Sequence, residues 1–381
     1  MTTVTKSKRY VSLDVLRGLT VTFMCMVNNP GSWAHMYAPM EHAPWTGCTP
    51  TDLIYPTFIF CMGCAMAFSL AKYEGNEAAA VWKIVKRSIA IFALGFILIL
   101  YPFFPTEGGH LVFGWDNWIE WLQGKRIFGV LQRIACAYLI GGLLAVWLKT
   151  PKKIAVAAGL LLVVYTAILV IFGTDPGPFT LEGNISRKID VALLGDNHVY
   201  HGYTYEDGTR AAFDPEGPLG AVSAAASCLI GYLVGLLIRH TEKTGSDRNE
   251  MVNRIFVAGL VSLALGEILG IWIPISKALW TASYVVYSAG WAMVLLAFFT
   301  FCIDLKGIEK PFKPFKVMGM NAMMAFILSA VFAKSYQFVG WSPSKYFGAD
   351  NFMSLVYSCI FAGVIMAILW VLYKKKIFVR L

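Results

Sequence analysis

The sequence predicts an all-α membrane protein: a polytopic bundle of about ten transmembrane helices with both termini in the cytoplasm. Composition is the first reason, because 57% of the 381 residues are apolar and only 14% are charged, whereas soluble domains are about a quarter charged. The second reason is a series of ten apolar runs, each close to the roughly 20 residues that cross a bilayer. The runs cover residues 11–29, 52–71, 87–104, 127–148, 153–173, 218–238, 254–273, 284–303, 316–335 and 352–373.

The basic residues predict the orientation of this bundle. Of the 32 Lys and Arg residues, 22 lie at the termini or in loops that alternating helices place on the same side as the termini. Cytoplasmic loops are enriched in Lys and Arg, so we assign this side to the cytoplasm. The formal net charge of +9 does not indicate nucleic-acid binding, because the bases lie in short clusters between apolar segments.

The first run contains two charges that a membrane helix does not readily accept. It follows a basic start, as in a signal peptide, but it holds Asp14 and Arg17 and no small-residue cleavage pattern follows, so we expect a retained helix. These two residues either pair with each other or leave Arg17 to line a polar cavity. Asn28 lies on nearly the same face about 16 Å further out, where it either extends this polar stripe or ends the helix.

The segment that joins the first two runs reads EHAPWTGCTPTDLI, residues 41–54, and the topology places it outside the cytoplasm. It holds His42 and Trp45 and leads to Asp52 at the start of the second helix. His42 is either a solvated loop residue or a group held over helix ends for chemistry. An imidazole, with a pKa near 6.5, suits proton transfer near neutral pH.

Two polar loops, 105–124 and 174–217, share this outer side, and the second is too long to be a simple connector. We treat residues 1–381 as a single domain that carries this long outer loop. The loop contains Asp196, His198 and His201, whose spacing can bind a metal. No third well-placed ligand completes the pattern, so no metal is expected.

Other polar side chains recur at the ends of later runs, several of them at the outer ends, which predicts a polar vestibule between the helices. The loops also supply many Trp and Tyr residues, suited either to the membrane interface or to stacking on sugar rings. Three motifs are absent from the sequence: GxxxxGK[ST] of nucleotide-binding proteins, GxSxG of serine hydrolases and HExxH of zinc proteases. The polar residues at these ends are Arg126, Gln132, Arg133, Asp214, Glu216, Lys277, Trp280 and Asn321.

Six motifs carry a family resemblance: SLDVLRG, VNNPG, HAPWTGCTPTDLIYPTFIFCMG, GVLQRIACAY, FDPEGPLG and SKALWTASYV. In this order they resemble the heparan-alpha-glucosaminide N-acetyltransferase family, including its bacterial homologues among the transmembrane acyltransferases. The resemblance implies an enzyme of the bacterial inner membrane whose active site opens to the periplasm. It implies transfer of acetyl from cytoplasmic acetyl-CoA, the co-substrate, to the amino group of a glucosamine-type sugar.

Partners follow from the same resemblance. The sequence lacks the large N-terminal luminal region of the animal enzyme, so the expected acceptor is a small amino sugar or a glycan fragment of the cell envelope. The lipid bilayer is the other expected partner, and a homodimer is compatible with the resemblance.

The resemblance also implies roles for residues. In lysosomal members the active histidine stands in the segment matched by EHAPWTG, which implies His42, with Asn28 as its polar neighbour. Asp52 is then placed to fix the imidazole tautomer, and His42 either activates the amine or carries the acetyl group itself. The polar stripe ending at Arg17 suggests a pore with the CoA phosphates at its inner end. Further candidates are Arg126, Gln132, Arg133, Lys277 and Asn321 for CoA, and Trp45, Asp214, Glu216 and Trp280 for the acceptor.

The alternative function is a secondary transporter or flippase for a sugar or a lipid-linked sugar. Ten spans and polar groups at membrane depth are compatible with it. The sequence shows no inverted repeat with paired broken helices, which counts against it.

Overall fold

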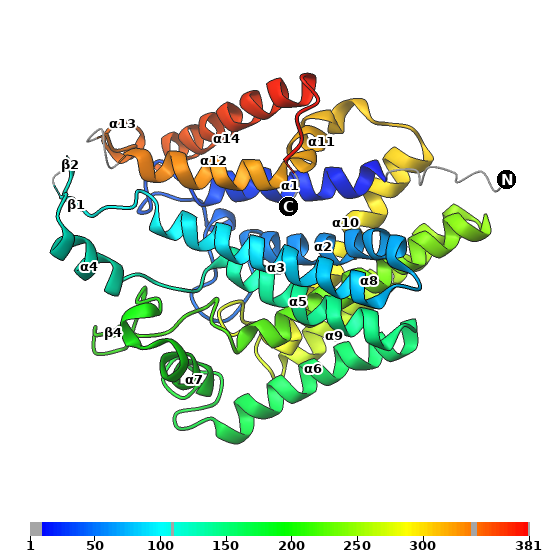
Figure 1. Ribbon diagram of the computed structural model, residues 1–381, viewed down its shortest axis with the longest axis horizontal. Helices are drawn as coiled ribbons and strands as arrows, with labels where there is room; N and C mark the ends of the chain where they lie inside the picture. Colours follow the sequence, from blue (N-terminus) through cyan, green and yellow to red (C-terminus); the bar gives the residue numbers. More distant parts are fainter. Residues whose placement is uncertain (1–9, 108–109, 337–340, 380–381) are drawn as a thin grey trace.

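A computed structural model describes residues 10–107, 110–336 and 341–379. Lys6, Lys8, Arg9 and Arg380, counted above among the clustered bases, lie outside the described residues. Within them the chain is an all-α bundle (Figure 1). The long helices are α1 (Val11–Val27), α2 (Ile54–Leu70), α3 (Glu77–Leu100), α5 (Val130–Leu148), α6 (Pro151–Phe172), α8 (Gly220–Thr244), α9 (Arg248–Gly270), α10 (Ala282–Phe299), α12 (Ala322–Ser335) and α14 (Asn351–Lys374).

Short elements connect them. Two antiparallel pairs of two-residue strands account for the sheet in the described part of the chain. The short elements are α4 (Trp115–Gln123), α7 (Ile185–Leu194), α11 (Lys313–Met320), α13 (Ser344–Phe347), β1 (Thr106–Glu107), β2 (His110–Leu111), β3 (Tyr203–Thr204) and β4 (Arg210–Ala211).

Every one of the ten apolar runs contains a helix, so the predicted all-α class is confirmed. Among the described residues, seven helices are long and apolar enough to cross a membrane by themselves. The segments Lys310–Met320 and Ala322–Ser335 give an eighth candidate, bent by 72° at the break between them. The count is below ten because α1 has only 17 residues and α3 carries three bases in its first half.

Glycines allow the central helices to approach closely. A Cβ added at Gly63 of α2 would lie 2.0 Å from a carbonyl oxygen of α8, and one added at Gly231 of α8 would lie 2.1 Å from a carbonyl oxygen of α2. Gly18 of α1 and Gly319 of α11 face each other in the same way, with distances of 1.7 and 1.8 Å. In a membrane, small residues at such crossings allow the backbone contact that holds helices together.

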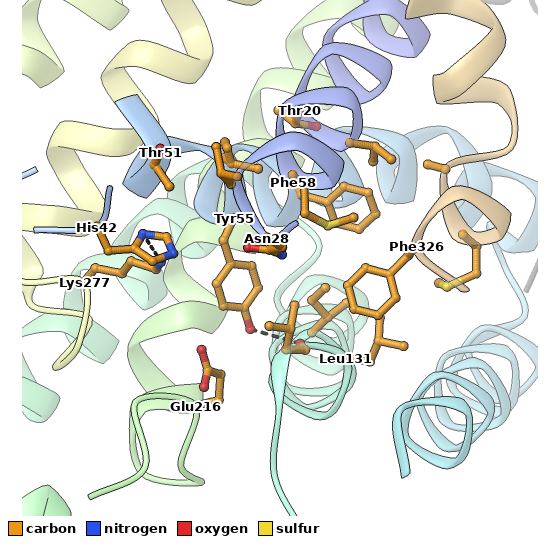
Figure 2. A pocket seen from close by; sticks show the side chains of 18 residues that line it. Thr20, Asn28, His42, Thr51, Tyr55, Phe58, Leu131, Glu216, Lys277 and Phe326 are labelled. Carbon is orange, nitrogen blue, oxygen red and sulfur yellow. Dashed lines mark hydrogen bonds between the residues drawn. The ribbon is translucent and has the colours of Figure 1, made fainter. Parts of the chain in front are cut away.

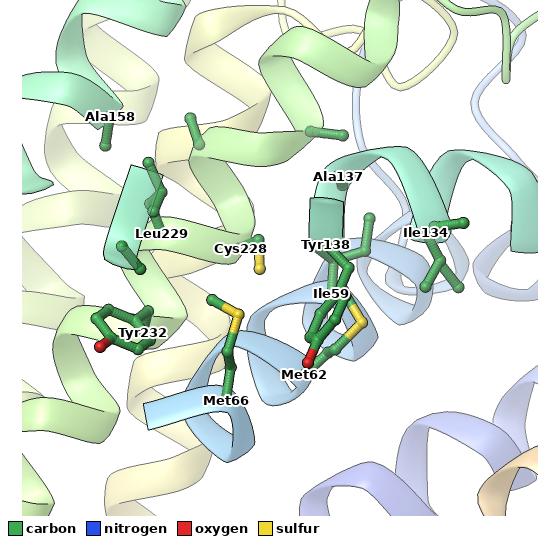
Figure 3. Packing of buried hydrophobic residues seen from close by; sticks show 14 of the residues in the cluster. Ile59, Met62, Met66, Ile134, Ala137, Tyr138, Ala158, Cys228, Leu229 and Tyr232 are labelled. Carbon is green, nitrogen blue, oxygen red and sulfur yellow. The ribbon is translucent and has the colours of Figure 1, made fainter. Parts of the chain in front are cut away.

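The largest apolar cluster lies where α2, α5, α6 and α8 meet (Figure 3). Ile59 and Met66 of α2 pack there with Tyr138 of α5 and Leu229 of α8, and all four side chains are fully buried. This cluster is the main apolar core of the bundle.

The polar loops gather at one end of the bundle. Figure 1 shows the β1–β2 pair, α4, α7 and β4 at this end, and the start of α1, the start of α6 and the end of α8 at the other. The two predicted sets of loops therefore lie at opposite ends of the molecule.

Candidate active site

Asp52 organises the segment that joins α1 to α2. It is fully buried and lies in the 3₁₀ turn Pro50–Leu53 that precedes α2. Its Oδ2 accepts hydrogen bonds from the backbone N–H of Ala43 (3.0 Å) and of Thr49 (3.1 Å), and from the Thr49 hydroxyl (3.1 Å). The Tyr284 hydroxyl of α10 donates to the Asp52 carbonyl oxygen at 2.6 Å. One carboxylate thus folds residues 42–49 back over the start of α2.

The other oxygen of Asp52 binds His42. Nδ1 of His42 lies 2.7 Å from Oδ1 of Asp52. A carboxylate oxygen accepts, so an ionised Asp52 holds the proton on Nδ1 and leaves Nε2 as the unprotonated nitrogen, the one that can accept a proton or act as a nucleophile. The His42 side chain is about half exposed, at 47%, so a reactant can reach the ring.

Lys277 completes the group from the loop between α9 and α10. Its Nζ lies 2.9 Å from Nδ1 and 3.2 Å from Nε2 of His42, and 3.4 Å from Oδ1 of Asp52. Burial lowers the pKa of Lys277, while Asp52 and Glu216 oppose this shift. A cation beside an imidazole and a carboxylate can donate to a developing oxyanion.

Two of the three groups, His42 and Lys277, line one end of a cavity of about 240 Å³, and Asp52 is buried behind His42. Figure 2 shows His42 and Lys277 on one side, the rings of Phe58 and Phe326 on the other, and Tyr55 between them. The walls are mostly apolar, and the polar side chains lie mainly toward His42. The lining residues are Thr20, Val21, Met24, Val27, Asn28, His42, Thr51, Ile54, Tyr55, Phe58, Val130, Leu131, Ile134, Glu216, Lys277, Ala322, Met323 and Phe326.

Glu216 brings a carboxylate to the same cavity. Arg126 holds it through an ion pair and also binds both oxygens of Asp214, at 2.8 and 2.5 Å. Burial raises the pKa of Glu216, but the Arg126 and Arg133 guanidinium groups outweigh this effect and leave it below its ordinary value. The cavity therefore carries an ionised acid as well as the His42–Lys277 pair.

Comparison with known proteins shows which proteins the chain resembles. Residues 9–188 match the family model described as heparan-alpha-glucosaminide N-acetyltransferase, catalytic. The chain is a relative of these acetyltransferases. It is 26% identical to the heparan-alpha-glucosaminide N-acetyltransferase of Mus musculus over 98% of its own length, and 26% identical to that of Homo sapiens over 97%. It spans about 60% of the length of these two relatives.

The segment that matches the family model contains Asn28, His42 and Asp52. Glu216 and Lys277 lie beyond it and reach the same cavity through the fold. The resemblance predicted from the six motifs is confirmed.

Gln132 and Arg133, two of the candidates for CoA binding, do not line the cavity, although Leu131 and Ile134 beside them in the sequence do. Arg133 is 2% exposed, donates to the Gly217 carbonyl oxygen at 3.2 Å and lies over the Trp280 ring at 5.2 Å. Gln132 is 1% exposed and packs against Gly95. In the structure these side chains support the loop that carries Glu216 and the neighbouring helix α3.

Arg17 and Asn321 are also separate from His42. The Arg17 guanidinium lies 3.9 Å from Asp14 on the same helix. The Asn321 amide binds the C-terminal segment, donating to the Ile377 carbonyl and accepting from the Val379 N–H, both at 3.0 Å. Neither residue lines the cavity. Asn28 does line it, and no hydrogen bond joins Asn28 to His42 in the part of the chain that the structure describes.

The two tryptophans proposed for the acceptor have structural contacts. The Trp45 ring packs against Tyr203 and Phe213, and its Nε1 donates to the Phe179 carbonyl oxygen at 2.7 Å. Trp280 is fully buried between helices. Trp45 thus joins the His42 segment to the loop 174–217.

Each of the two loop histidines, His198 and His201, contacts a backbone carbonyl oxygen. Nδ1 of His198 lies 2.7 Å from the Lys125 carbonyl oxygen, and Nδ1 of His201 lies 3.2 Å from that of Val199. Among the described residues, no group of three His, Cys, Asp or Glu side chains is placed to hold a metal ion.

Sequence reasoning missed Tyr55 and Phe326. Tyr55 lines the cavity and donates from its hydroxyl to the Val130 carbonyl oxygen at 3.0 Å. It follows Asp52 by three residues, a spacing that places both on one helical face and could have indicated it. Phe326 had no such signal, because it comes from α12, far along the chain.

Proposed function

We propose that this protein is a transmembrane N-acetyltransferase that moves acetyl from cytoplasmic acetyl-CoA to the amino group of a glucosamine-type sugar on the other side of the membrane. The observation that carries the proposal is the Asp52–His42–Lys277 group at the end of a cavity inside the bundle. The reaction class comes from the acetyltransferases that the chain resembles.

Each residue of the group has a distinct role in this proposal. The sugar amine attacks the thioester carbonyl, a C–N bond forms, the C–S bond breaks and the CoA thiolate leaves. Nε2 of His42 takes the amine proton and returns it to the sulfur, or Nε2 first accepts the acetyl group and passes it on. Asp52 fixes the ring and its tautomer. Lys277, 3.2 Å from Nε2, donates to the developing oxyanion.

The cavity suits the thioester end of the donor rather than the whole of it. Its volume of about 240 Å³ is below the roughly 300–1,000 Å³ of sites that enclose a drug-sized ligand. The nucleotide would then lie beyond the cavity, with Arg17 as the proposed contact at the inner end. Lys277→Gln should lower kcat while the acetyl-CoA Kd stays within threefold, whereas Arg17→Gln should raise that Kd. A tenfold loss of affinity confined to Lys277→Gln would place the phosphates at the His42 end.

Charge favours an acceptor that is cationic or neutral. The loop 174–217 holds eight acidic and three basic residues, a net charge of −5. Glu216 adds an ionised carboxylate to the cavity, where it can hold the ammonium form of the sugar until His42 takes a proton. A sulfated polyanion would be repelled by this surface, so we propose an unsulfated amino sugar or glycan fragment.

The decisive test is the release of free thiol by purified protein given acetyl-CoA and glucosamine. His42→Ala should lower the rate by on the order of 100-fold or more, because a general base contributes about that much. Acetyl-CoA binding should persist. His201→Ala, a histidine of the same end that does not line the cavity, is the control. A His42→Ala rate within twofold of the unchanged protein would remove His42 from the mechanism.

The proposed orientation puts both termini in the cytoplasm of a bacterial cell and the His42 end in the periplasm. An impermeant thiol reagent applied to intact spheroplasts should label Asn197→Cys and spare Ser246→Cys, since both positions are exposed and lie at opposite ends. Right-side-out vesicles loaded with acetyl-CoA should then acetylate external glucosamine. Labelling of Ser246→Cys but not of Asn197→Cys would overturn the proposed orientation and leave the proposed acetyl transfer untouched.

One observation favours the alternative of a transporter or flippase. The 72° break between α11 and α12 lies beside the cavity, and broken helices often line transport sites. The thiol assay decides, because a transporter moves glucosamine without releasing CoA.

A further inference from the structure

A second cavity lies at the end of the bundle opposite His42. It measures about 510 Å³ and is bounded by the end of α8 and the turn between α5 and α6. Figure 1 shows both elements at the end away from the loop 174–217. Its lining residues are Lys149, Pro151, Leu233, Leu236, Leu237, Arg239, His240 and Lys243, which we call the basic groove.

The groove has a graded surface along α8. Leu233, Leu236, His240 and Lys243 are spaced by three or four residues and therefore share one helical face. The leucines are half-buried, and the two basic residues that follow are exposed. From Leu233 to Lys243 the helix rises about 15 Å. The groove thus changes from apolar to cationic toward the membrane surface, in the order that a phospholipid changes from acyl chain to headgroup.

Two of its four basic side chains are free to bind an anion. Lys149 pairs with Glu77, and Arg239 pairs with Glu74. The side chains of His240 and Lys243 make no hydrogen bond or ion pair with the described residues. Helix α6, whose first residue Pro151 lines the groove, exposes apolar side chains further along, such as Leu160 at 56%, so an acyl chain has apolar surface to follow.

We propose that the basic groove binds an anionic glycerophospholipid, with the phosphate at His240 and Lys243 and one acyl chain along the leucines of α8. Charge complementarity selects an anionic headgroup, and the half-buried leucines select a lipid over a soluble phosphate. This proposal does not depend on the acetyltransferase activity.

The test uses the full-length protein purified in detergent and exposed to mixed micelles of phosphatidylglycerol and phosphatidylcholine. Native mass spectrometry counts the bound lipids. Phosphatidylglycerol should be retained in preference to phosphatidylcholine, and Lys243→Gln should weaken retention by about fivefold, as expected for one basic residue near an anionic headgroup. Lys152→Gln is the matched control, because Lys152 is exposed at the same end and does not line the groove.

A second variant separates a lipid from a soluble anion. Leu236→Trp fills the groove without changing its charge, so it should weaken phosphatidylglycerol retention and leave thermal stability close to that of the unchanged protein. If glycerol phosphate competes as well as the lipid and Leu236→Trp has no effect, the groove binds a soluble anion and the proposal fails. An equal loss in Lys152→Gln would also overturn it, since surface charge alone would then explain retention.

Discussion

At the end of the bundle that holds His42, two acids that form ion pairs are fully buried: the side chains of Asp52 and Asp214 have no exposed surface. At the opposite end the Arg254–Glu250 pair faces solvent, with side chains 64% and 56% exposed. A buried charge that loses its partner has no water to replace it, whereas an exposed one does. The same residue types therefore shape a cavity at one end and contribute little to stability at the other.

The largest effect should come from Asp52→Asn, which keeps the size of the side chain but removes its charge. The ring of His42 can then turn or take the other tautomer, and we expect acetyl transfer to fall by on the order of 100-fold or more. Thiol release measures it, with Asp207→Asn in the exposed outer loop as control. Equal rates for the two variants would show that Asp52 only folds the segment.

Next in size is the stability change for Arg126→Met, which leaves Asp214 and Glu216 without their shared cation. Removing one partner of a buried ion pair costs about 3 kcal/mol or more. The midpoint of thermal unfolding in detergent should fall clearly, while Arg210→Met, at an exposed position of strand β4, should not lower it. Replacing Asp214 and Glu216 by Asn and Gln in the Arg126→Met background should restore part of the loss.

Asp190, at the end of the bundle that holds His42, should make the stability of the protein depend on pH. It is 1% exposed in α7, and burial raises its pKa from 3.8 to about 7, although the Leu219 N–H donates to it. Between pH 4 and 7 the unfolded chain loses this proton and the folded chain keeps it, so stability falls as pH rises, by up to about 4 kcal/mol. Asp190→Asn should flatten the pH dependence of the unfolding midpoint. An unchanged slope would mean that Asp190 is ionised when folded.

The smallest effect is expected at the exposed end. Arg254→Gln breaks a pair on the solvent face of α9 and should change the free energy of unfolding by less than about 0.5 kcal/mol. A loss comparable to that of Arg126→Met would remove the difference between the two ends.

The helices and the segment that carries His42 could be predicted from sequence because their signals are local. Apolar runs of sufficient length define helices, and Asp52 lies only ten residues after His42. The reason why fewer than ten helices are clear membrane spans can also be read from the sequence, since the bases of α3 are visible there. Local spacing thus accounts for the bundle and for the pairing of histidine with carboxylate.

The rest of the site depends on contacts between distant residues. Lys277 lies 235 residues from His42, and Arg126 lies 88 residues from Asp214. A sequence shows that these side chains are polar and near helix ends, but not which partner each one meets. Lys277 was therefore one of several candidates for CoA binding, and its contact with the imidazole became visible only in the structure. Asn321 is a similar case, because its partners come from the last residues of the chain.

The contact of Asn321 links two parts of the molecule that lie more than 50 residues apart in the sequence. Asn321 joins the segment after α14 to the break between α11 and α12, and Figure 1 shows this segment turning back toward α11. The first turns of α12 then supply Ala322, Met323 and Phe326 to the cavity wall. Residues 377–379 do not line the cavity, so altering them is a way to change its α12 wall without replacing any lining residue.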